Sequence, residues 1–308
     1  MTLQQLEYIV SVESERNFNR AAEKCFVTQP TLSMQIQKLE EELGVEIFDR
    51  NQKPVQATKD GSLIISKARQ ILKEAYTITS FAKKEHQVIE GEFKIGVIPT
   101  LAPYLLPLFL QDFSTKHPKT ILQIEELYTR DIINRLLNNT LDIGLVVTPI
   151  NIKDIREVPL FKESFYIFTS EDHPYYTQTK VDYSTLTDEG LWLLEQGHCF
   201  RNQVLNICGR TTNKKSNIKY ESGSIEALKN IIKKNYGYTL VPELSIIDES
   251  KNNIRSFVDP IPVREVSLVV KSTFLKENLI KNFKKSILDS LPEELAKVTK
   301  GLLINIEE

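Results

Sequence analysis

Two cysteines lie nine positions apart in the stretch from 196 to 210, QGHCFRNQVLNICGR. Cys199 follows His198 and precedes Arg201 by two positions, whereas Cys208 ends an apolar run. A thiolate reacts far faster than a thiol, and a neighbouring imidazole or guanidinium stabilises it by charge and hydrogen bonding. We therefore predict that Cys199 is the reactive cysteine, and that Cys208 is a buried partner with a raised pKa.

The spacing of the two cysteines links chemistry to conformation. If residues 202–207 are helical, a rise of about 1.5 Å per residue keeps the two Cα atoms roughly 12–14 Å apart. A disulfide tolerates only about 4.4–6.8 Å. Bridging them would require the segment to unwind, so oxidation and conformational change would be one event. The alternative is two unrelated cysteines, one in a core and one in a loop, because most free cysteines are inert and buried.

The composition is that of an ordinary globular protein. Hydrophobic residues make up 41% and charged residues 26% of the 308 residues, so there is enough sequence for two or three domains with cores of their own. No apolar run approaches the roughly 18–20 residues of a membrane span, and the beginning MTLQQLEYIV lacks the pattern of a signal peptide. We expect a cytoplasmic protein with no membrane partner. Three cysteines in a reducing compartment suggest redox or metal chemistry rather than a disulfide framework.

The first 58 residues read as a small helical domain with a wing. Thr2 and Gln5 have capping-box spacing, and the first helix is expected to end near Ser14. Two further helical segments follow, separated by a break at 25–28, with Asn19 as the expected cap of the first and Thr28 of the second. Residues 45–58 read as strand, turn and strand. Cys25 is interpreted as a core residue.

Polar side chains off the buried stripe of the third helix are suited to reading DNA. Gln, Ser and Thr can hydrogen-bond base edges and phosphates in a major groove, and a basic wing can touch phosphates or the minor groove. The alternative is a helical domain whose polar face is only solvated, since the net charge of −2 gives no support of its own. The predicted DNA contacts are Gln29, Pro30, Thr31, Ser33, Gln35, Lys38, Arg50 and Lys53.

Apolar residues then step by four and three along 59–87 without interruption, the seam of a coiled coil. This seam predicts a helix that pairs with its copy in a dimer, although a helix packed on its own protein would show the same pattern. The seam residues are Ile64, Ala68, Ile71, Ala75, Ile78 and Ala82.

After residue 90 the periodicity changes to strands that alternate with helices, which predicts a mostly parallel α/β sheet. We expect strands ending at 99 and over 121–127, 142–147, 164–170, 191–195, 218–221, 238–242 and 263–270, and helices over 101–113, 132–138, 224–234 and 275–288. Thr100 and Thr129 follow two of these strands, and both could offer a hydroxyl to an anion or a peroxide. A helix cap is as good an interpretation for Thr129.

The stretch FNRAAEKCFVTQPTLSMQIQKLEEELGVEIFDR resembles the winged helix-turn-helix of LysR-type transcriptional regulators, and the resemblance continues through the whole chain. It implies an α/β protein with an N-terminal all-α winged helix-turn-helix domain (1–58), a linker or dimerisation helix (59–90) and a two-lobed periplasmic-binding-protein-like effector domain (91–308). Lobe I would comprise about 91–162 and 267–308, and lobe II about 163–266.

GHCFRNQVLNIC is similar to the redox loop of the peroxide-sensing members of that family. The resemblance implies that Cys199 is oxidised by hydrogen peroxide to a sulfenic acid, that Cys208 resolves it as an intramolecular disulfide, and that Thr100, His198 and Arg201 handle the peroxide. Thr100, Thr129 and Asn202 would line the ligand site. These members often have aspartate where this chain has Asn202, a change that should favour the thiolate.

The resemblance further implies double-stranded promoter DNA with two half-sites, a homodimer or homotetramer, RNA polymerase and thiol reductants as partners, and control of oxidative-stress genes as an activator. No cofactor is expected, and no metal, because His86, His117 and His173 are scattered without ligand spacing. Two rivals remain. One is a LysR-type regulator that binds a small metabolite between the lobes, and the other, opposed by the helix-turn-helix, is a thiol peroxidase; we expect a protein that is not an enzyme.

Overall fold

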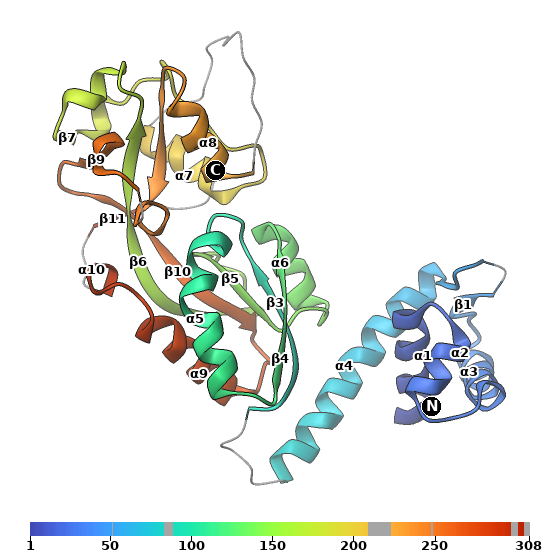
Figure 1. Ribbon diagram of the computed structural model, residues 1–308. Helices are drawn as coiled ribbons and strands as arrows, with labels where there is room; N and C mark the ends of the chain where they lie inside the picture. Colours follow the sequence, from blue (N-terminus) through green and yellow to red (C-terminus); the bar gives the residue numbers. More distant parts are fainter. Residues whose placement is uncertain (51, 83–88, 209–222, 248, 297–300, 305–308) are drawn as a thin grey trace. The chain divides into compact units, whose positions relative to one another are not determined.

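The computed structural model describes the chain except for residues 51, 83–88, 209–222, 248, 297–300 and 305–308 (Figure 1). It divides into two compact units, Met1–His86 and Gln87–Glu308, each described here by itself. Within the described residues, no helix is both long and apolar enough to cross a membrane.

The N-terminal unit is a helical domain with a two-stranded wing. Its elements are α1 (Leu3–Glu15), α2 (Phe18–Lys24), α3 (Gln29–Leu43), β1 (Phe48–Asp49), β2 (Gln56–Ala57) and α4 (Lys59–Ala82). The antiparallel wing pairs Phe48 with Ala57. Apolar side chains from all four helices and β1 form one core, which excludes water from the faces that the helical periodicity marked as apolar. Cys25 packs against this core, as expected.

Side-chain caps decide where these helices begin. Thr2 and Gln5 form the expected capping box. Asn17, and not Asn19 as predicted, caps α2: its side chain accepts from the backbone N–H of Asn19 and Arg20. Thr28 caps α3, so each helix start has a partner for N–H groups that the helix itself leaves unpaired.

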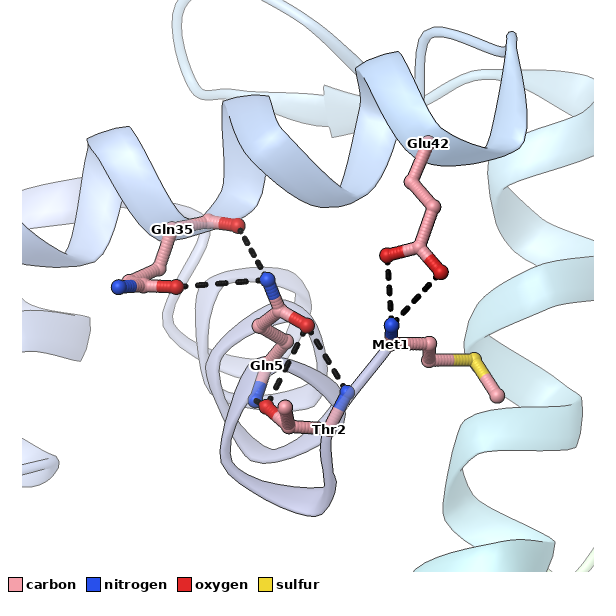
Figure 2. A network of polar contacts seen from close by, with 5 residues as sticks. All are labelled: Met1, Thr2, Gln5, Gln35 and Glu42. Atoms are coloured by element: carbon pink, nitrogen blue, oxygen red, sulfur yellow. Dashed lines mark hydrogen bonds and ion pairs between the residues drawn. The ribbon is translucent and has the colours of Figure 1, made fainter.

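Gln5 also ties α1 to α3. Its Nε2 donates to the carbonyl of Gln35 at 3.4 Å and to Gln35 Oε1 at 3.3 Å (Figure 2). Beside it, the amino group of Met1 donates to both carboxylate oxygens of Glu42, at 2.7 and 2.5 Å. Both contacts fix the orientation of α3 against the start of α1.

Helix α4 carries the predicted seam, but its first part packs inside its own unit. Ala68 is 1% exposed in the core, and Ile64 packs against that core. These two residues therefore follow the alternative to a dimer seam, a helix packed on its own protein. Ile71 is 40% exposed, and Ala75 is half-buried. The side chains of Ile78 and Ala82, and the predicted continuation to 87, lie outside the described residues.

The C-terminal unit is built on a mixed sheet with the order β4-β3-β5-β10-β6-β9-β7, to which β8 adds beside β6 and β11 beside β10 (Figure 1). Its strands are β3 (Gly91–Val97), β4 (Thr120–Glu126), β5 (Ile143–Thr148), β6 (Ile155–Thr169), β7 (Lys180–Val181), β8 (Tyr238–Pro242), β9 (Ile254–Phe257), β10 (Pro262–Lys271) and β11 (Leu302–Leu303). Its helices are α5 (Ala102–Lys116), α6 (Thr129–Leu137), η1 (Pro174–Thr177), η2 (Tyr183–Thr185), α7 (Cys199–Cys208), α8 (Ile225–Ile232), η3 (Glu243–Ile246), η4 (Lys251–Asn253), α9 (Glu277–Asp289) and α10 (Glu293–Ala296).

Two apolar cores divide this unit into two lobes. The core of lobe I lies among β3, β5, α5, α6 and α9, and the core of lobe II lies among β8, α7 and α8. Strand β6 contributes side chains to both cores, because Phe161 is buried in the core of lobe I and Phe165 in the core of lobe II. Its antiparallel partner β10 runs beside it from Ile155–Lys271 to Ser164–Val263. The two strands therefore carry the chain between the lobes (Figure 1).

The prediction of a mostly parallel sheet was wrong for the centre of the sheet. Strands β4, β3 and β5 are parallel, as are the pairs β7-β9 and β10-β11, but β10 is antiparallel to both β5 and β6. The strand predicted at 191–195 is reduced to a single bridge between Leu191 and Tyr238. The strand predicted at 218–221 lies outside the described residues, and β9 was not predicted.

Candidate functional site

Cys199 and Cys208 are the first and last residues of α7, so the segment between them is helical, the condition on which the distance argument depended. Nine steps of about 1.5 Å separate their Cα atoms by roughly 13–14 Å, far beyond the reach of a disulfide. All three cysteines are free thiols in this structure. A bond between Cys199 and Cys208 therefore requires α7 to lose helical structure.

The two cysteines pack against different lobes. Helix α7 buries Phe200, Val204 and Ile207 in the core of lobe II, and Cys208 lies in the same core with 7% exposure. Cys199, half-buried, packs instead against the core of lobe I. The start of α7 thus lies where the two lobes meet.

The surroundings of Cys199 act on its thiol in opposite directions. Burial raises the pKa of Cys199, while the Thr129 hydroxyl, the positive charge of Arg264 and the backbone N–H of Phe200 lower it. The thiol thus has a desolvated resting state, with groups beside it that stabilise the thiolate once it forms.

Arg264 is a site residue that sequence reasoning missed. It is fully buried on β10 and pairs with Glu163 of β6, with its Nη2 2.6 Å and its Nε 2.8 Å from Glu163 Oε1. Its Nη1 donates to Thr100 Oγ1 at 3.1 Å, and its guanidinium lies 5.4 Å from the centre of the Phe200 ring. An arginine in the apolar strand VREVSLVV was the signal available, because a buried charge needs a partner.

Arg201 does not have the predicted place beside the thiol. Its Nη1 donates to the carbonyl of Leu194 at 2.6 Å, and the cation that lowers the pKa of Cys199 is Arg264. Asn202 is half-buried on α7, one residue further along. Sequence proximity suggested Arg201, whereas the fold brings Arg264 from a distant strand.

His198 is buried, with 4% exposure, and burial lowers its pKa against the opposing charge of Glu195. Among the described residues its Nε2 has no hydrogen-bond partner, and the nearest carboxylate oxygen, Glu195 Oε1, is 3.7 Å away. Thr129 Oγ1 is also buried without a well-formed hydrogen bond in the described chain, although its hydroxyl is near enough to Cys199 to affect the thiol's pKa. Buried polar atoms left unpaired are suited to holding a small polar molecule.

The other end of α7 is aromatic. Tyr238 is fully buried, and its hydroxyl donates to the carbonyl of Thr187. Burial raises the pKa of Tyr238, and the neighbouring Cys208 raises it further. The ring of Tyr175 meets that of Tyr238 edge to face at 5.0 Å. Cys208 therefore lies beside the Tyr238 hydroxyl, within a packed core that contains several aromatic rings.

In the N-terminal unit, most of the predicted DNA contacts are accessible. Pro30, Thr31, Lys38, Arg50 and Lys53 are exposed, and Gln29, Ser33 and Gln35 are half-buried. Arg50 pairs with Glu40 at 2.8 Å and lies 5.6 Å from the centre of the Phe18 ring, so part of its charge is compensated within the domain. The roles of these residues stay predictions.

Comparison with known protein families identifies both units. Residues 3–62 match the bacterial regulatory helix-turn-helix family of lysR type, and residues 86–292 match the LysR substrate binding domain. The chain is 32% identical over 305 residues to the hydrogen peroxide-inducible genes activator of Haemophilus influenzae, covering 98% of this chain and 100% of that protein. It is 34% identical over 274 residues to the dual regulator OxyR of Escherichia coli, covering 88% and 90% of the two chains.

Solved structures agree. Full-length OxyR of Pseudomonas aeruginosa, in a variant form, superposes with a TM-score of 0.80 at 34% identity, over 94% of this chain and 99% of that one. The expected fold class is thereby confirmed: a helix-turn-helix domain followed by a two-lobed α/β effector domain. The chain belongs to the LysR family of DNA-binding transcriptional regulators.

Proposed function

We propose that this regulator senses hydrogen peroxide through a thiol–disulfide switch between Cys199 and Cys208 and thereby controls oxidative-stress genes. The observation that carries the proposal is that the desolvated thiol of Cys199 lies beside two groups that stabilise its thiolate, the buried Thr129 hydroxyl and the charge of Arg264. The relatives named as activators of hydrogen peroxide-inducible genes support the same function.

The chemistry proceeds in two balanced steps. The Cys199 thiolate attacks one peroxide oxygen, an S–O bond forms as the O–O bond breaks, and the departing hydroxide takes up the thiol proton to leave as water. Cys208 then attacks the sulfenic sulfur, an S–S bond forms as the S–O bond breaks, and the second oxygen leaves as water with the proton of Cys208. Two thiols and one peroxide thus give one disulfide and two waters.

The switch acts because the disulfide cannot coexist with a helical α7. Unwinding removes Cys199 from the lobe boundary, which rearranges the effector domain and, in an oligomer, the spacing of the DNA-binding domains. We infer a homotetramer, built as a dimer of dimers that reads two promoter half-sites, with RNA polymerase as the partner in activation. Cellular thiol reductants would reset the disulfide.

Intact mass with thiol labelling tests the switch. One equivalent of peroxide should give a Cys199–Cys208 bridge in the reduced wild-type chain within seconds. Cys199→Ser should not react, and Cys208→Ser should stop at a sulfenic acid that dimedone traps. Cys25→Ser is the matched control and should still form the bridge. Unmodified thiols in the wild type would contradict the proposal and favour a regulator that binds a metabolite between the lobes.

Turnover separates a sensor from a thiol peroxidase. With excess peroxide and no reductant, a sensor consumes about one peroxide per chain and stops. With a dithiol reductant added, sustained consumption at rates typical of enzymes would favour the peroxidase.

A further inference from the structure

A tyrosine of lobe I reaches across to the segment that leads into Cys199. Tyr128, the residue before α6, donates its hydroxyl to Glu195 Oε1 at 2.5 Å. Its ring also meets the His198 imidazole edge to face, with centroids 4.8 Å apart at 88°. Glu195 and His198 both belong to the short stretch before α7, so Tyr128 holds this stretch against lobe I.

The same carboxylate oxygen also faces the imidazole. Glu195 Oε1 is 3.7 Å from His198 Nε2, too far for a hydrogen bond, and it already accepts the proton of Tyr128. The backbone also comes close here, because a Cβ on Gly223 would lie 3.0 Å from His198 Nε2 and 3.3 Å from Glu195 Oε1. The imidazole is therefore fixed between Tyr128, Glu195 and the backbone of Gly223.

Disulfide formation must disturb one end of α7, and the contacts differ at the two ends. Withdrawing Cys208 would vacate a position in the packed core of lobe II, and emptying core volume is costly. Withdrawing Cys199 displaces a half-buried residue and the stretch before it. The Cys199 end is therefore the end that moves, and its movement separates Glu195 from Tyr128.

We propose, on the basis of the peroxide-sensing function proposed above, that Tyr128 and Glu195 are positioning residues that hold the His198–Cys199 segment against lobe I in the reduced state only. They thereby set both the balance between thiols and disulfide and the protonation of His198. Neither residue takes part in the transfer of oxygen.

The chain contains a matched control for this hydrogen bond. Tyr104, on α5 of lobe I, donates to Glu226 Oε1 on α8 of lobe II at 2.8 Å. It is the same kind of contact between the same two lobes. Glu226, however, pairs with Lys229 and is not part of the segment that carries Cys199.

The first measurement is the redox equilibrium of the full-length chain in mixtures of reduced and oxidised dithiothreitol, followed by intact mass after acid quenching and alkylation. Tyr128→Phe should shift the equilibrium about tenfold toward the disulfide, because a hydrogen bond to a charged acceptor is lost from the reduced state alone. Tyr104→Phe should shift it less than twofold. An unchanged equilibrium in Tyr128→Phe, or an equal shift in both variants, would overturn the proposal.

The second measurement is the pH profile of Cys199 oxidation in a Cys208→Ser background, which a merely structural role of Tyr128 would leave unmoved. Without the Tyr128 hydroxyl, Glu195 Oε1 is free to approach His198 Nε2, so the inflection on the acid side should move to higher pH. Adding Glu195→Gln should reverse that movement. The groups that face His198 or its neighbours are Glu195 from its own segment, Tyr128 and Asp131 from the start of α6, Cys199 from α7, and Arg264 from β10.

The two proposals fail in different ways. A wild-type chain that forms no Cys199–Cys208 bridge with peroxide or with oxidised dithiothreitol would overturn the switch and this inference together. If the wild-type chain forms the bridge but Tyr128→Phe behaves like the wild type in both measurements, only the positioning roles are overturned.

Discussion

The two ends of α7 carry the same functional group in opposite settings. At the first end, Cys199 lies between the lobes with a buried cation, Arg264, and a buried hydroxyl, Thr129, beside its thiol. At the last end, Cys208 lies in an apolar and aromatic core next to Tyr238. The difference teaches that a reactive cysteine here is defined less by its neighbours in sequence than by strands and helices brought to it from elsewhere.

The comparison also explains why one helix serves both thiols. Its length keeps the thiols apart while they are reduced, and its two ends are anchored in different lobes. Joining them therefore must change the relation between the lobes. The expected effects of changes at each end follow, from the largest to the smallest.

The largest expected effect is at Arg264. Arg264→Met leaves Glu163 buried without its partner and should lower the free energy of unfolding by about 3–5 kcal/mol, measured by urea denaturation. It should also slow oxidation of Cys199, because the nearby positive charge is lost. The double variant with Glu163→Met should regain much of the stability. Arg156→Met, which breaks the exposed pair with Glu277, is the control and should cost only about 0–1 kcal/mol.

The next effect is the pH dependence of the first chemical step. Because burial raises the pKa of Cys199, its thiol form dominates at neutral pH and the thiolate fraction grows as pH rises. The rate of oxidation in a Cys208→Ser background should therefore rise about tenfold per pH unit below that pKa. Stopped-flow measurements between about pH 6.5 and 9 test this, and a flat profile would mean that the thiolate is already formed.

The smallest effect is expected at the Cys208 end. Tyr238→Phe removes the hydroxyl that donates to Thr187 and should lower stability by about 0.5–1.5 kcal/mol. It should slow disulfide closure by less than tenfold and leave the first oxidation step unchanged. Tyr175→Phe removes a hydroxyl of the same aromatic cluster that donates to Thr185, and should alter stability alone. A change in the first step in Tyr238→Phe would contradict the separation of the two ends.

Local features of the fold were predictable because they depend on residues close in sequence. The capping box of Thr2 and Gln5 and the cap at Thr28 follow from residue type and spacing, and the helix assumed between Cys199 and Cys208 is present. Spacing alone can still select the wrong residue. Asn17 and Asn19 are both of a type that caps helices well, and α2 begins directly after Asn17.

Features that depend on pairing across the chain were not predictable. The apolar stretch after Gly190 has the composition of a strand, yet it makes a single bridge, because Gly190 and Trp192 both hydrogen-bond to Tyr238 and the pairing goes no further. The site divides in the same way. Cys199, His198 and Thr100 were named from sequence and stay predictions, whereas Arg264 was not named because only the pairing of β6 with β10 places it beside Glu163.

That pairing has a topological consequence. Ser164 and Val263 are partners in register, so the chain leaves lobe I and returns to it at one place in the sheet. Lobe II is thus an insertion into lobe I, and the Glu163–Arg264 pair lies directly next to the Ser164–Val263 pair at which the inserted segment begins and ends. A graft that exchanges the whole of 164–263 between related chains would transplant Cys199 and Cys208 together, while a truncation inside that range that removed β8 or β9 would leave the end of β6 without a partner strand.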